Sequence, residues 1–187
     1  MAGSTDPTGD TILDSVRTLA PSLHARAGQA EQDRCIPTET IDDFRATEMF
    51  RLLQPKRFGG LELDFAAVAR VQMEIGKSCA SSAWVGGLAM THQWLVANFP
   101  LQAQEDVWGD NPNAIAFGSY SAGNKAEPVE GGFLATGSWA FSSGCDHGDW
   151  ALLGITFPAD DEHKTPYPGL MLAPASEPNL SKSICSK

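Results

Sequence analysis

The hydrophobic pattern changes its period once, near residue 112, and this change constrains the fold more than any other feature of the sequence. Before it, apolar residues recur at three- and four-residue spacing, as at Ile12, Val16 and Leu19, which predicts amphipathic helices. After it, short apolar runs are bounded by Gly, Pro, Asn and acidic turns, which predicts β-strands. Helices segregated from strands indicate the α+β class. We therefore expect a helical domain over residues 1–112 and a β domain over residues 113–187.

Start and stop signals divide the first half of the helical part. Asp10 can cap a first helix, which Pro21 kinks or splits. Pro37 suits the first turn of a second helix, because a missing N–H costs nothing there. Residues 52–60 contain a proline and a glycine pair, so an extended connector is predicted.

Two longer helices and a short one are predicted after this connector. Asp64 can cap the third helix, and Ser81 or Ser82 can cap a fourth that runs to about Phe99. A short acidic helix over residues 102–108 follows. The residues expected to face inward from the third helix are Phe65, Val68, Val71 and Ile75.

The fourth predicted helix places a histidine in an apolar stripe. Helical spacing brings His92 onto one face with four apolar residues. Two interpretations remain open: His92 is a satisfied core residue, or it lines an elongated pocket together with Trp84. The apolar members of the stripe are Trp84, Leu88, Leu95 and Phe99.

The β part contains one stretch with unusual chemistry, G-S-W-A-F-S-S-G-C-D-H-G-D-W over residues 137–150. Glycines allow close approach of the backbone, and adjacent hydroxyls supply donors, so the stretch suits contact with a flat polar ligand. The alternative is a strand pair with its tryptophans in the core. Asp146 and His147 are interpreted as adjacent strand residues on opposite faces, and therefore as structural. Strands are predicted over 114–120, 132–143, 149–157 and 169–173, with a hairpin turn at 130–132.

Composition excludes several classes of protein. The net charge of −10 argues against a nucleic-acid groove or an anionic membrane surface. Four scattered cysteines predict neither a disulfide scaffold nor a zinc site, and Cys145 has no basic neighbour to activate it. The longest apolar run, 83–90, is far shorter than the roughly 20 residues of a membrane helix. With no secretory signal visible, we expect a cytoplasmic protein.

Five motifs in this order resemble one family. The chain is similar to the oxygenase components of two-component flavin-dependent aromatic hydroxylases, of the seco-steroid phenol hydroxylase and p-hydroxyphenylacetate hydroxylase type. These enzymes have the acyl-CoA dehydrogenase fold, and the likeness runs from about residue 12 to residue 177. The motifs are L-L-Q-P-K-R-F-G-G at 52–60, S-S-A-W-V at 81–85, T-H-Q-W at 91–94, Q-E-D-V-W-G-D at 104–110, and the stretch at 137–150.

The resemblance implies roles for particular residues. Ser143 is expected near flavin N5 and His92 against the phenol pocket, both as catalytic residues. The alternative for Ser143 is an ordinary strand serine, and for His92 it is a buried structural histidine. Trp84 could instead serve only to pack its helix against its neighbours. The implied cofactor-binding residues are Trp84, Gly118, Ser119, Tyr120, Phe141, Ser142 and Ser143.

The implied activity is hydroxylation of a phenolic substrate with O2, using reduced FMN or FAD from a separate flavin reductase. Members of this family are longer and form homo-tetramers, so a partial β-barrel or sandwich domain and a missing C-terminal four-helix domain are expected here. The alternatives are an acyl-CoA dehydrogenase, which oxidises a CH–CH bond with FAD, and an inactive truncated fragment that binds partners. The motif at 137–150 favours the hydroxylases, because dehydrogenases carry W-I-T-N in its place.

Overall fold

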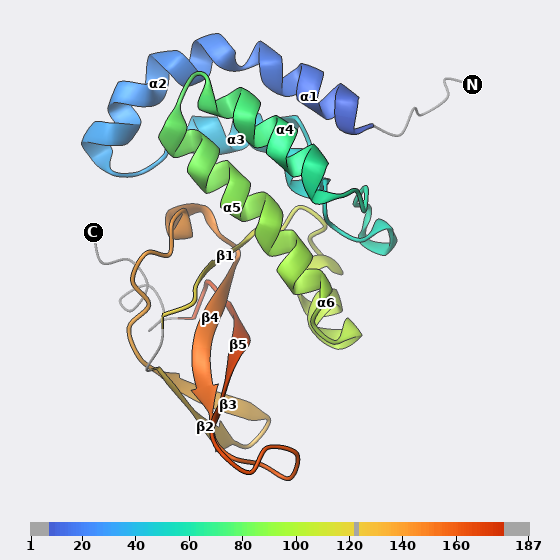
Figure 1. Ribbon diagram of the computed structural model, residues 1–187, viewed down its shortest axis with the longest axis vertical. Coiled ribbons are helices and arrows are strands. Elements are labelled where there is room, and N and C mark those ends of the chain that lie inside the picture. The colour runs from blue at the N-terminus through green and yellow to red at the C-terminus, as the bar shows by residue number, and fades with distance from the viewer. Residues whose placement is uncertain (1–7, 122–123, 178–187) are drawn as a thin grey trace. The chain divides into compact units, whose positions relative to one another are not determined.

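The computed structural model describes residues 8–121 and 124–177. The chain is α+β, as predicted, with helices first and a sheet second (Figure 1). It divides into two compact units, which we call the helical unit, within residues 1–115, and the β unit, within residues 116–187. No helix in the described ranges is long and apolar enough to cross a membrane.

The first helices begin where local signals place them, with one correction. A break at Leu19 separates α1 from α2, and Pro21 lies in the first turn of α2, so the predicted split is confirmed. Thr8 caps α1, since its Oγ1 accepts from Thr11 N at 3.3 Å. The prediction that Asp10 caps this helix was wrong. Asp10 lies in the first turn of α1, where its Oδ1 forms an ion pair with Arg70 Nη1 at 2.6 Å. The helices are α1 (Gly9–Thr18), α2 (Ala20–Asp33), α3 (Thr38–Ala46), α4 (Phe65–Gly76), α5 (Ala80–Ala97) and α6 (Leu101–Trp108), with 3-10 turns η1 (Met49–Arg51) and η2 (Lys56–Phe58).

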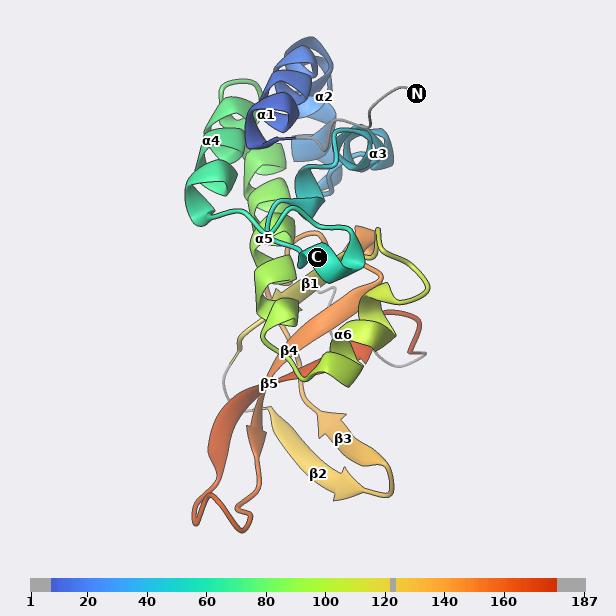
Figure 2. The ribbon, with the colours of Figure 1, turned by 90° about the vertical axis from the view of Figure 1, so that its right-hand side faces the viewer.

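The α4 and α5 helices lie side by side in the helical unit (Figure 2). Asp64 caps α4 as predicted, because its Oδ1 accepts from Ala67 N at 3.1 Å. Cys79, not Ser81 or Ser82, caps α5: its Sγ accepts from Ser82 N at 3.5 Å. Either serine would lie inside the helix, so the predicted cap was wrong by two or three positions.

The α5 helix packs closely against its neighbours at small residues, whereas the apolar stripe that we predicted does not form its buried face. A Cβ at Gly87 would lie 2.4 Å from the Gln72 amide carbon, and one at Gly86 would lie 3.1 Å from Met49 Cε. His92 is 1% exposed, whereas Trp84 is 59% exposed, so the two do not share a buried face. The prediction was wrong because close helix packing selected small side chains over large ones. Phe65, also predicted inward, is half-exposed and contacts Trp94 edge-on at 5.5 Å.

The β unit is a five-stranded sheet around β4, which pairs in parallel with β1 and antiparallel with β5. The β2 and β3 strands form a hairpin closed by Glu130 and Gly131, as predicted, and Gly131 has φ +81°. The core contains Trp139, whose Nε1 donates to Gly154 O at 2.8 Å. The strands are β1 (Ala116–Ser119), β2 (Lys125–Val129), β3 (Gly132–Thr136), β4 (Trp150–Phe157) and β5 (Tyr167–Pro174).

The predicted strand over 132–143 was wrong in its second half. The β3 strand ends at Thr136, and residues 137–148 form a loop, which we call the serine loop, with a 3-10 turn at Cys145–His147. Asp146 and His147 therefore lie on a turn, so the argument from strand alternation does not apply to them. Cys145 is disulfide-bonded, a bond that the scattered cysteines of the sequence had not led us to expect.

Candidate functional site

The serine loop is packed against the first strand through two glycines. A Cβ at Gly144 would lie 2.3 Å from Phe117 Cε1, and a Cβ at Gly148 would lie 2.8 Å from Phe117 Cδ2. Gly144 also has φ +86°, which glycine adopts without strain. These glycines thus allow the backbone of the serine loop to lie close to the buried Phe117 ring. Sequence reasoning had assigned such an approach to a ligand.

Asn124 holds the start of the serine loop, and sequence reasoning missed it. Its Nδ2 donates to Ser121 O at 3.0 Å and to Gly154 O at 3.3 Å, and its Oδ1 accepts from Ser138 N at 3.0 Å. A Cβ at Gly137 would lie only 2.1 Å from that Oδ1, so the glycine makes room for the amide. The one available signal was a lone Asn ahead of a glycine-initiated loop, which is too common to single out.

Ser119 ties the end of β1 to the same loop. Its Oγ donates to Ala140 O at 2.5 Å and lies 2.9 Å from Ser121 Oγ. Gly118 pairs with Leu152 on β4, and a Cβ there would lie 2.6 Å from Leu152 O, so this strand position has no room for a side chain. Two segments that were predicted to bind a cofactor are therefore neighbours within the β unit.

The three loop residues predicted to contact flavin differ in exposure. Phe141 is 92% exposed and has φ +61°, a left-handed conformation that is unfavourable for a bulky residue. Ser142 is 5% exposed, and among the described residues its Oγ has no hydrogen-bond partner. Ser143 is half-buried, and its N–H donates to Phe141 O at 2.9 Å. A strained backbone beside an orphaned buried hydroxyl is typical of functional sites.

Tyr120 follows β1 directly. Burial of its hydroxyl raises the pKa of Tyr120 to about 12, although about half of the residue as a whole is exposed. The hydroxyl therefore stays protonated at neutral pH and can donate a hydrogen bond.

The remaining two candidates, Trp84 and His92, lie on α5 in the helical unit. Trp84 is 59% exposed, whereas His92 is 1% exposed. The other six candidates belong to the β unit.

The β-unit residues fit a flavin in their chemistry. An isoalloxazine ring offers a flat apolar face and a polar edge, which match an exposed aromatic ring and unsatisfied or protonated hydroxyls. Phe141 supplies the ring, and Tyr120 and Ser142 supply the hydroxyls. Among the described residues, no group of three His, Cys, Asp or Glu side chains could hold a metal ion.

Comparison with known proteins gives the family. The chain is 37% identical to the oxygenase component of the FADH(2)-dependent resorcinol hydroxylase of Rhizobium sp. (strain MTP-10005) over 166 residues, which are 89% of this chain and 40% of that protein. It is 40% identical to the oxygenase subunit HsaA, a flavin-dependent monooxygenase of Rhodococcus jostii (strain RHA1), over 76% of this chain and 37% of that protein. The crystal structure of 3-HSA hydroxylase from Rhodococcus sp. RHA1 superposes with a TM-score of 0.84 and 33% identity, over 91% of this chain and 44% of that chain.

The chain thus spans less than half the length of the relatives that it matches. Residues 6–109, more than half of the chain, match the model of the acyl-CoA dehydrogenase N-terminal domain. This protein belongs to the acyl-CoA dehydrogenase family, and its relatives are oxygenase components of flavin-dependent monooxygenases.

Proposed function

We propose that this chain forms part of the oxygenase component of a reduced-flavin-dependent monooxygenase that hydroxylates a phenolic substrate with O2. The observation that carries the proposal is the pairing of Phe141 with Ser142 in the serine loop. An almost fully exposed aromatic ring is held in a strained conformation directly beside a buried hydroxyl without a partner among the described residues. Both features become favourable when a flat, polar-edged ligand covers them.

The residues of the β unit would hold the flavin. Phe141 would stack on the ring and exclude water from it, while Tyr120 would donate a hydrogen bond from a hydroxyl that stays protonated. Ser142 and Ser143 would offer hydroxyls to the polar edge, with Ser143 next to N5 and the backbone of Gly118 and Ser119 alongside. A reduced flavin, when bound, supplies the electrons with which O2 is activated for aromatic hydroxylation.

The residues of the helical unit would serve the substrate side. His92 is our candidate for the residue that faces the phenol hydroxyl, because an imidazole can serve as a general base toward a phenol. Trp84 would cover the flavin with its exposed indole. The roles of both residues stay predictions.

The partners follow from the same proposal. A two-component oxygenase needs a separate reductase to deliver reduced FMN or FAD, and a small phenol as substrate. Homo-tetramer formation and a cytoplasmic location also stay predictions.

An acyl-CoA dehydrogenase remains the second candidate, on fold alone. The relatives described above are hydroxylases and monooxygenases, which favours the oxygenase.

Flavin binding tests the proposal. We expect the chain to quench flavin fluorescence and to bind reduced FMN or FAD, measured anaerobically, more tightly than the oxidised form. Phe141→Ala should weaken binding, whereas Phe133→Ala, which truncates a half-exposed ring on β3, should not. Equal effects of the two substitutions, or no preference for reduced flavin, would contradict the proposal.

A further inference from the structure

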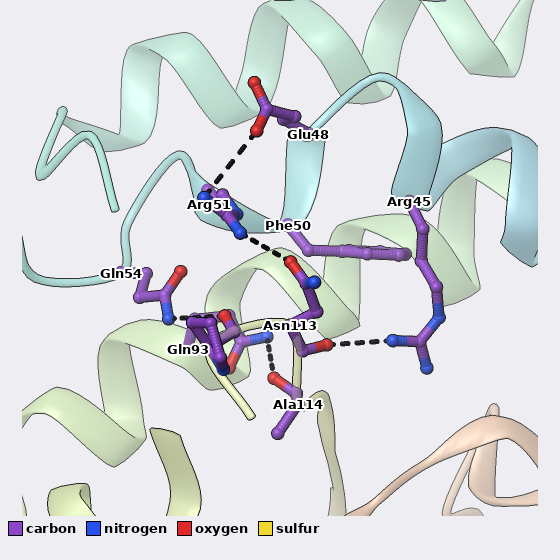
Figure 3. A pocket seen from close by; sticks show the side chains of 9 residues that line it. Arg45, Glu48, Phe50, Arg51, Gln54, Gln93, Asn113 and Ala114 are labelled. Atoms are coloured by element: carbon purple, nitrogen blue, oxygen red, sulfur yellow. Dashed lines mark hydrogen bonds and ion pairs between the residues drawn. The ribbon is translucent and has the colours of Figure 1, made fainter. Parts of the chain in front are cut away.

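The helical unit contains a small cavity with a mixed polar and apolar lining beside the segment 111–114, which we call the exit strap (Figure 3). The cavity has a volume of about 20 Å³. A site that holds one water needs roughly 10–15 Å³ by this measure, so the cavity is large enough for one water molecule and too small for an organic ligand. Its lining includes Arg51, Gln54 and Gln93.

Four side chains hold the exit strap through its carbonyl and amide oxygens (Figure 3). Asn113 receives two of these bonds, one on its backbone oxygen and one on its side chain. All four donors come from segments much earlier in the chain, so the strap is fixed by tertiary contacts. The bonds are Arg45 Nη1 to Asn113 O at 2.8 Å, Arg51 Nη2 to Asn113 Oδ1 at 2.6 Å, Gln54 Nε2 to Pro112 O at 2.9 Å, and Gln93 Nε2 to Ala114 O at 3.2 Å.

The unusual atom in this cluster is Gln93 Oε1. Gln93 is 2% exposed, and no donor among the described residues reaches its Oε1. The amide cannot be turned over, because Nε2 must face Ala114 O and an exchange would bring two acceptors together. A buried acceptor without a donor costs about 1–3 kcal/mol, so such atoms in folded proteins normally bind ordered water.

We propose that this cavity is a binding site for one structural water, which donates a hydrogen bond to Gln93 Oε1 and completes the clamp on the exit strap. The molecule in the cavity must be small, neutral and able to donate a hydrogen bond. The guanidinium groups of Arg45 and Arg51 in the lining disfavour a cation, and an anion has no proton to donate to Gln93 Oε1. The clamp acts on residues 112–114, which shortly precede β1 in the sequence.

Crystals of the 187-residue chain at a resolution that reveals ordered water provide the direct test. We expect a single solvent peak within about 3.2 Å of Gln93 Oε1 in the cavity. An empty cavity, or density with the coordination of a metal ion or an anion, would overturn the proposal.

A pair of variants tests whether Gln93 holds the water. Gln93→Met keeps the length of the side chain and removes the amide, so the solvent peak should disappear and the exit-strap amides should exchange faster with deuterium. Gln104→Met is the matched control, since Gln104 is buried and its Nε2 donates to Ala97 O and Phe99 O, away from the cavity. A water that persists in Gln93→Met, or equal exchange of the strap in both variants, contradicts the assignment. If Gln93→Met fails to fold, the wild-type crystal still decides.

Discussion

Replacing Asn124 by alanine should destabilise the β unit, because this side chain joins the segment after β1, the serine loop and β4. The substitution removes three hydrogen bonds, at 3.0, 3.0 and 3.3 Å, from a residue that is 5% exposed. The longest is weak, and its acceptor, Gly154 O, keeps its bond from Trp139. The two others contribute about 0.5–1.5 kcal/mol each, so the free energy of unfolding should fall by about 1–3 kcal/mol.

Asn124→Asp separates the roles of donor and acceptor. The carboxylate can still accept from Ser138 N, but it faces two carbonyl oxygens that lost their donor, which raises its pKa in the folded state. A raised folded pKa favours the protonated form, so the deficit should be small below about pH 4 and should grow as the pH rises through the pKa of the folded state.

Urea unfolding followed by the NMR amide signals of the β-strands measures these losses in the β unit alone. Asn98→Ala is the control, because Asn98 makes one exposed bond, to Trp94 O at 2.6 Å in the helical unit. A loss for Asn124→Ala no larger than that for Asn98→Ala would refute the claim that this amide organises the serine loop.

Three further predictions concern other residues of the β unit. Phe141→Gly should leave stability almost unchanged, because relief of a strain of roughly 1–2 kcal/mol offsets the entropy of glycine, while flavin affinity falls; a protein that loses stability but keeps its flavin affinity contradicts this. Ser143→Ala should weaken flavin binding by at most roughly tenfold and, in a catalytically competent assembly, release more hydrogen peroxide per product, and unchanged values would make Ser143 an ordinary loop serine. Tyr120 should make the β unit less stable as the pH rises from about 10 to about 12, because its proton is held more tightly in the folded state. Tyr120→Phe should remove that dependence in urea unfolding, and a wild-type slope in the variant would show that another group causes it.

The candidate site was only partly predictable from the sequence. The resemblance to flavin-dependent oxygenases is confirmed by the family match and by relatives at 32–40% identity. The individual site residues stay predictions. Sequence spacing had grouped Trp84 with His92 on one buried face, and the structure separates them by exposure.

What the sequence determined by itself is what depends on neighbours in the chain. The split at Pro21, the cap at Asp64 and the turn at Gly131 each follow from backbone geometry within a few residues, and all three are confirmed. The α+β class follows from hydrophobic period, which is also a local property.

What only the tertiary structure decided depends on residues far apart in the sequence. The serine loop leaves the strand pattern because Asn124, 14 positions earlier, binds Ser138 N, and because the Phe117 ring occupies the space above Gly144 and Gly148. The exposure of Trp84 and the burial of His92 were set by which helices pack against α5. A pattern of residue types records that a side chain is apolar or small, but the partner that fills the space beside it is chosen only when the chain folds.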